Sequence, residues 1–233
     1  GLHRRLRPMP ARWALIPLLW FTFGSTLWMA DAILERLPHV QDSITYLFQA
    51  QTLARGHLWA PPPPQPELFR QEFMTVFQDK WFGQYLPGFP LLLSLGVILD
   101  AAWVVNPLLA TLTVPLLYTL GRHLYGHRAG LLAAFLAPFS PFFLLLSGSM
   151  MVHPAELFWT TLFLVGSLRA LNRPFLRHWA ALAGIALGML LLTRQVTAVA
   201  VALPSVLFLL AGDRSRWTPS VRSTLARRVG LLI

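Results

Sequence analysis

Several apolar runs, each close to the length that crosses a lipid bilayer, constrain this chain more than any other feature of its sequence. The first run, residues 13–32, follows a basic segment, and the later runs lie between clusters of arginine. A helix of about 20 apolar residues crosses the roughly 30 Å hydrocarbon core of a membrane. Charged residues make up only 12% of the chain, about half of their usual share in a soluble domain. We therefore predict an all-α, polytopic transmembrane helix bundle.

The distribution of basic residues predicts how the bundle is oriented. The net charge is +10, but the arginines gather in short segments between apolar runs, which is typical of cytoplasmic loops and not of a nucleic-acid site. If residues 89–105 crossed the membrane, only five of the nineteen basic residues would face the cytoplasm; if these residues stay outside, fourteen do. We choose the second topology. It predicts an integral, multi-pass protein of a bacterial inner (plasma) membrane, with a cytoplasmic N-terminus and no nucleic-acid partner.

This topology divides the chain into spans and one long outer loop. The predicted spans are about 13–32, 106–121, 129–147, 154–171, 179–193 and 196–211. The outer loop, 33–105, is expected to carry interfacial helices, because the amphipathic segment 42–55 is too short to cross the membrane. The competing interpretation of the first run is a cleaved signal peptide, since Ala30-Asp31-Ala32 resembles a cleavage site. We expect residues 1–233 to be the N-terminal part of one membrane domain, with the C-terminal part missing.

The small-residue pattern Gly184-x-x-x-Gly188 lies inside one of the predicted spans. Such a pattern predicts that two helices pack closely.

Asp42 follows the first span and starts the predicted interfacial helix. One interpretation is structural: Asp42 or Ser43 caps the helix N-terminus. The other is that Asp42 is a catalytic carboxylate at the membrane surface. The other ionisable or polar candidates that the topology places at the same leaflet are His39, Lys80, Gln84, Tyr85, His153, Glu156 and Arg194. This convergence favours a functional site over a set of unrelated caps and turns.

Each of these candidates has a plainer explanation that the sequence leaves open. His153 and Glu156 fit the polar start of a helix, where a carboxylate complements the helix dipole. Arg194 fits a turn that reaches lipid headgroups, or a site that binds a phosphate through the forked guanidinium. His39, Asp42 and His153 could bind a divalent metal, but their spacing is not diagnostic, so we expect neither a metal site nor a cofactor.

Motifs in a fixed order resemble those of the GT-C superfamily of membrane glycosyltransferases, in particular the aminoarabinose and protein O-mannosyltransferase branch. They are Pro38-His39-x-x-Asp42-x-x-x-Tyr46, Tyr85-Leu86-Pro87-Gly88-Phe89-Pro90, Asn106-Pro107-Leu108-Leu109, Ser140-Pro141-Phe142-Phe143 and Leu192-Thr193-Arg194. The resemblance implies transfer of a sugar from a polyprenyl-phosphate donor to a lipid, glycan or protein acceptor on the outer face. It implies that Asp42 is the general base and that Lys80 and Arg194 neutralise the phosphate leaving group. His39, Tyr46, Gln84, Tyr85, His153 and Glu156 would complete the substrate site.

Two non-enzymatic alternatives remain at this stage. A lipid transporter or flippase predicts charges along a pathway through the membrane and internal repeats, and the sequence has neither. An assembly scaffold predicts that the candidate residues spread around the outer surface and do not meet in one place.

Overall fold

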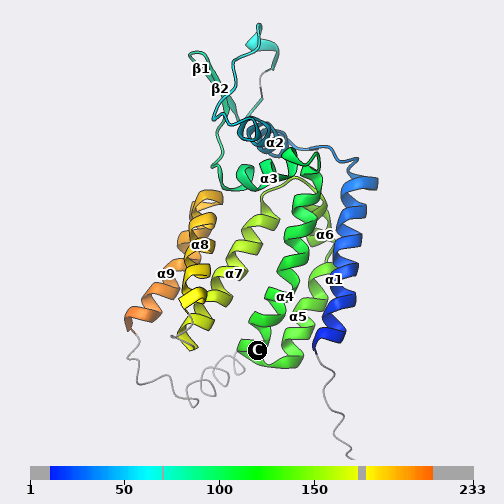
Figure 1. The fold of residues 1–233 in the computed structure, drawn as a ribbon, viewed down its shortest axis with the longest axis vertical. Coiled ribbons are helices and arrows are strands. Elements are labelled where there is room, and N and C mark those ends of the chain that lie inside the picture. Colours follow the sequence, from blue (N-terminus) through cyan, green and yellow to red (C-terminus); the bar gives the residue numbers. More distant parts are fainter. Residues whose placement is uncertain (1–10, 70, 173–176, 212–233) are drawn as a thin grey trace, which may run out of the picture.

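The computed structural model describes residues 11–69, 71–172 and 177–211. Upright helices form a bundle, and two shorter helices lie across one end of it (Figure 1). The upright helices are α1 (Ala11–Trp28), α4 (Val105–Tyr125), α5 (His127–Phe139), α6 (Pro141–Gly148), α7 (His153–Asn172), α8 (Arg177–Thr193) and α9 (Gln195–Ala211). A π-helical turn, η1 (Met29–Ile33), extends α1. The predicted all-α membrane bundle is confirmed.

Two segments of the described residues are long and apolar enough to cross a membrane, Trp13–Ile33 and Ala102–Tyr125. The pair α5–α6 would make a third span, but it is bent by 62°, whereas the sequence suggested one continuous span over 129–147. The bend has a local cause. Ser140 is extended and its hydroxyl accepts a hydrogen bond from Phe143 N, which starts a new helix, and Pro141 brings no backbone N–H to continue the old one.

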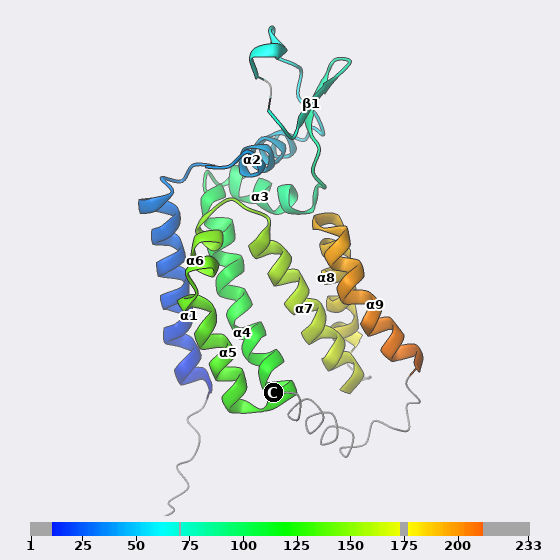
Figure 2. The same cartoon turned by 180° about the vertical axis from the view of Figure 1, so that it is seen from behind.

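The residues between α1 and α4 form the crown, which we define as residues 34–104. It contains α2 (Gln41–Ala54), the turn η2 (Pro66–Phe69), strands β1 (Met74–Phe77) and β2 (Lys80–Gly83), α3 (Gly88–Ile98) and the turn η3 (Ala102–Val104). The sequence indicated interfacial helices here but not the antiparallel hairpin, which pairs Met74 with Gly83 and Phe77 with Lys80. The hairpin projects from the crown, away from the bundle (Figures 1 and 2).

A shared core holds the crown on the bundle. Tyr46 and Ala50 of α2 pack with Phe89 and Leu93 of α3 and with Ala155 of α7, and all five are buried. Burying side chains of this size contributes about 1.5–3 kcal/mol for each large one. The crown is therefore fixed on the ends of α4 and α7 by apolar contact, in addition to the chain connections.

The expected packing role of Gly184 and Gly188 is wrong for the described part of the chain, since no atom of another helix there lies within 4 Å of a Cβ built on either residue. Helices α7 and α8 instead approach at Gly166, where an added Cβ would lie 3.2 Å from Ala183. A small-residue pattern shows where a second helix could pack closely. The position of the second helix in the fold decides which face of the first helix it contacts.

The acidic side chains distinguish the two ends of the bundle. All acidic side chains of the described residues belong to the crown or to helix ends beside it: Asp31, Glu35, Asp42, Glu67, Glu72, Asp79, Asp100 and Glu156. The opposite end, where α4 and α7 finish and α5 and α8 begin (Figure 2), carries Arg122, Arg128, Arg169 and Arg177. This polarity matches the pattern of basic cytoplasmic loops.

Candidate functional site

Asp42 is not the N-cap residue of helix α2. Helix α2 starts one residue earlier, at Gln41, with Val40 as the N-cap residue and no capping bond from the Asp42 carboxylate. The hydroxyl of Ser43 takes that role: it accepts from Val40 N at 3.2 Å and donates to Val40 O at 2.8 Å. The capping explanation for Asp42 is therefore wrong, and its carboxylate is available for another role.

The Asp42 carboxylate is held by a tyrosine from the far end of the loop. Its Oδ1 accepts a short hydrogen bond from the Tyr85 hydroxyl. The Tyr85 ring stacks on Tyr46, with centroids 4.5 Å apart, and packs against Phe73 on the loop. Tyr46 in turn meets Phe89 edge to face at 5.1 Å. These aromatic contacts leave the Tyr85 hydroxyl little freedom to turn away from Asp42.

Burial and the nearby carboxylate keep both tyrosines protonated. Burial, followed by the charge of Asp42, raises the pKa of Tyr46 to about 12. The pKa of Tyr85 also rises, first by burial and then by its hydrogen bond to Asp42. A neutral Tyr85 donates a hydrogen bond to the carboxylate, so Asp42 is oriented while its second oxygen stays available.

A second polar cluster lies where α8 turns into α9. Arg194 Nη1 donates to Glu156 Oε2 at 2.9 Å and lies 3.3 Å from His153 Nδ1, both residues being at the start of α7. The Thr197 hydroxyl donates to the other Glu156 oxygen. The Glu156 side chain is only 17% exposed, but that of Arg194 is 48% exposed. The guanidinium is thus fixed through one nitrogen, and its remaining N–H groups can bind an anion.

The start of α3 connects the two clusters. A Cβ on Gly88 would lie 2.6 Å from Leu192 O and from Thr193 Oγ1, so the Tyr85–Gly88 loop touches the turn that carries Arg194. The charges of Arg194 and Glu156 also act on the Tyr46 hydroxyl, together with that of Asp42. Tyr46 therefore lies within electrostatic range of both clusters. Six predicted residues come together here: Asp42, Tyr46, Tyr85, His153, Glu156 and Arg194.

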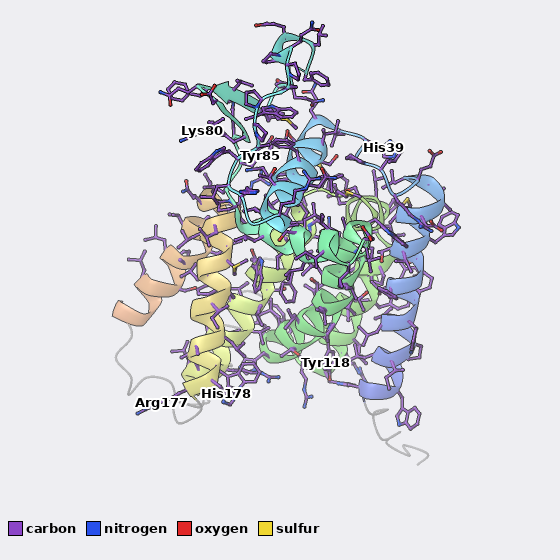
Figure 3. All side chains as sticks on the ribbon, turned by 45° about the horizontal axis from the view of Figure 1, so that its top comes forward. His39, Lys80, Tyr85, Tyr118, Arg177 and His178 are labelled. Carbon is purple, nitrogen blue, oxygen red and sulfur yellow. The ribbon has the colours of Figure 1, made fainter. Side chains whose placement is uncertain are left out.

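Three other predicted residues point elsewhere. The His39 ring bonds Leu34 O at 2.8 Å, the Lys80 ammonium lies 4.4 Å from the centre of the Trp59 ring, and the Gln84 amide donates to Thr75 Oγ1 at 2.8 Å. Figure 3 shows His39 beside α1 and Lys80 farther out than Tyr85, toward the hairpin. Within the described residues, no hydrogen bond or ion pair joins any of the three to Asp42 or Arg194.

Gln49 and Thr197 belong to this arrangement but were missed in the sequence. The Gln49 amide donates to Gly83 O at 3.2 Å and to Tyr85 O at 2.9 Å, which ties the loop to α2. Gln49 lies one and two turns beyond Tyr46 and Asp42, on the same helical face, so the helical period could have indicated it. Thr197 lies three residues after Arg194, near the start of α9. This spacing could also have indicated that the two side chains share one face.

Replacing Gln49 by methionine tests how the loop is held. The substitution keeps the side-chain length but leaves the Gly83 and Tyr85 carbonyls without their donor, which costs about 1–3 kcal/mol. We expect Gln49→Met to lower the thermal unfolding midpoint of the detergent-purified protein. The matched control is Gln51→Met, on the exposed face of the same helix; an equal fall in both variants would contradict the role of Gln49.

A cavity of about 430 Å³ opens beside the second cluster, between α6, α7 and α9. Its polar lining includes His153, Glu156 and Thr197, and its apolar lining includes Phe143 and Leu146. Within residues 11–69, 71–172 and 177–211, no group of three or more His, Asp or Glu side chains is placed to hold a metal ion. The arrangement is an oriented carboxylate and a fixed guanidinium at one end of a membrane bundle, next to a partly apolar cavity.

These features define a class: an integral membrane protein with a polar site where the helices meet the bilayer surface. The chain belongs to the dolichyl-phosphate-mannose-protein mannosyltransferase family, whose family model matches residues 82–233. Members of this family are membrane glycosyltransferases of the GT-C type, so the resemblance seen in the sequence is confirmed. No curated protein and no solved structure matches the chain. The matched range includes Tyr85, Glu156 and Arg194 but begins after Asp42.

Proposed function

We propose that the chain transfers a sugar from a polyprenyl-phosphate donor to a lipid, glycan or protein acceptor, with Asp42 as general base. The observation that carries the proposal is that the Tyr85–Gly88 loop contacts both clusters: Tyr85 bonds Asp42, and Gly88 packs on the turn that carries Arg194. The cavity between α6, α7 and α9 adjoins the second cluster, because His153, Glu156 and Thr197 line it. A base and a phosphate-binding cation on one surface are the two groups that this reaction needs.

The chemistry follows from these two groups. The acceptor hydroxyl or amine gives its proton to Asp42 as its oxygen or nitrogen attacks the anomeric carbon of the sugar. The bond from that carbon to the phosphate oxygen breaks, and its electron pair stays on the oxygen. Arg194 neutralises the growing phosphate charge, and the polyprenyl phosphate leaves. The displacement is single, so the configuration at the anomeric carbon inverts. Lys80 is not assigned to the phosphate, because its ammonium lies against Trp59.

The orientation that fits this function places the crown outside and the arginine-rich end in the cytoplasm of a bacterial inner membrane. Support comes from Arg122, Arg128, Arg169 and Arg177 at the other end, because basic residues in short loops favour the cytoplasmic side. A site at the headgroup boundary suits a donor whose lipid chain stays in the bilayer.

The reaction class is tested by offering two labelled donors to membranes that contain the protein. We expect transfer from a polyprenyl-phosphate sugar and none from the water-soluble nucleotide sugar. Transfer from the nucleotide sugar alone would contradict the proposed donor, and failure with both would favour a scaffold or transporter.

We propose that the cavity between α6, α7 and α9 holds the lipid chain of the donor. Neighbouring residues of α6 test this. Leu146 lines the cavity, whereas Leu145 is 46% exposed on the outside of the bundle. We expect Leu146→Trp to fill the cavity and raise the KM for the lipid donor roughly tenfold, a loss of about 1.4 kcal/mol of binding. Leu145→Trp is expected to leave the KM unchanged. Equal values for the two variants would place the lipid chain elsewhere.

A further inference from the structure

A second cavity lies at the arginine-rich end, far from the polar clusters. It has a volume of about 590 Å³ and runs between α1 and α5, which stand side by side in both views (Figures 1 and 2). All of its lining residues are apolar except Arg128, the second residue of α5. The lining positions on α5 recur at helical spacing, Arg128, Leu131, Phe135 and Phe139, so they share one face.

This groove has a polar end at Arg128 and an aromatic end at Phe139. Phe21 of α1 stacks on Phe139 of α5, with centroids 4.9 Å apart, and Phe135 packs on Phe139 at 4.5 Å. Arg128 and Phe139 are 11 residues apart in one helix, about 16 Å along its axis. That length is close to half of the roughly 30 Å hydrocarbon core. The groove therefore has the depth of a single leaflet.

Arg128 is exposed and has no partner among the described residues, since no hydrogen bond, ion pair or ring contact involves it. Two other arginines of this end have partners: Arg122 donates to the Tyr118 hydroxyl, and Arg169 lies 4.2 Å from the centre of the Trp179 ring. No acidic side chain of the described part of the chain lies at this end. A free guanidinium at headgroup depth, above a groove of acyl-chain length, is complementary to a phosphate-bearing lipid.

We propose that the groove between α1 and α5 is a binding site for an anionic phospholipid of the arginine-rich leaflet. One acyl chain lies along α5 as far as the Phe21–Phe139 stack, and the headgroup phosphate binds Arg128. A polyprenyl chain fits less well, because it is much longer than the roughly 16 Å that separates Arg128 from Phe139 along α5. This site does not depend on the proposed glycosyltransferase reaction.

Lipid retention by the purified chain tests the site. The protein is titrated in detergent with phosphatidylglycerol, with phosphatidylcholine and with polyprenyl phosphate, and bound lipid is counted by native mass spectrometry. We expect phosphatidylglycerol to bind most tightly, and Arg128→Gln to weaken it roughly tenfold, the loss of one charge-assisted bond. Arg177→Gln removes the same charge at the same end but outside the groove, and is expected to change nothing.

A filling variant gives an independent measurement. Ala14→Phe places a ring in the groove, and Ile16→Phe places one on an exposed position of the same helix, outside the groove. We expect only Ala14→Phe to displace phosphatidylglycerol. Equal binding of phosphatidylcholine, equal effects of the two arginine variants, no displacement by Ala14→Phe, or an Arg128-dependent preference for polyprenyl phosphate would each overturn the proposal.

Discussion

Asp42→Asn is expected to lower the rate of sugar transfer by about 10²–10⁴, the usual contribution of a positioned general base. An asparagine keeps the size of the side chain and can still accept the hydrogen bond that Tyr85 donates to position 42. It cannot take a proton from the acceptor. The measurement is the initial rate of label transfer from a polyprenyl-phosphate sugar in membranes with matched protein content.

The stability of the same variant separates catalysis from structure. Ser43, not Asp42, satisfies the start of α2, so we expect the thermal unfolding midpoint of Asp42→Asn to equal that of the wild type. A lost cap would cost about 1 kcal/mol and lower that midpoint. Asp79→Asn, at the hairpin turn, is the matched control and is expected to keep full activity. Wild-type transfer by Asp42→Asn would remove this carboxylate from the mechanism.

Arg194→Gln is expected to lower kcat by about 10²–10³, comparable to removing a donor that stabilises developing negative charge. The charge on the leaving phosphate grows toward the transition state, so the loss falls mainly on kcat and less on the KM for the donor. Steady-state kinetics with a polyprenyl-phosphate sugar measure both constants. A rise in KM alone would mean that Arg194 binds the donor without assisting its departure.

Two further variants make this result specific. Arg194→Lys keeps a positive charge beside Glu156 but loses the forked geometry, so its kcat is expected to lie between those of the wild type and Arg194→Gln. Arg36 is a matched control at the same end of the bundle: it pairs with Asp31 at 2.6 Å and lies over Trp103, outside both clusters. Arg36→Gln is expected to transfer at the wild-type rate, and an equal loss there would indicate a general effect of surface charge.

Apolar run length and charge placement were sufficient to predict much of the fold. They predicted a helical membrane bundle, interfacial helices between the first two spans, and the arginines at the opposite end. These properties are readable because they depend on sums over many residues, such as the transfer of 20 side chains into hydrocarbon. The motif order also identified the family. The hairpin β1–β2 was not predicted, because short strands stabilised mainly by pairing leave a weak local pattern.

Run length and charge placement could not predict which side chains contact one another. Tyr85 reaches Asp42 across 43 positions because α3 packs on α2. Arg194 reaches Glu156 across 38 positions because α8 and α9 pack on α7. His39 and Lys80 are near Asp42 or Tyr85 in sequence, yet each binds a local partner, Leu34 and Trp59. Turning a polar side chain on a loop changes the free energy little. Its direction is therefore decided by local partners and by the path of the chain. Composition and periodicity placed these residues at one membrane surface, and the packing of α3 selected those that lie together.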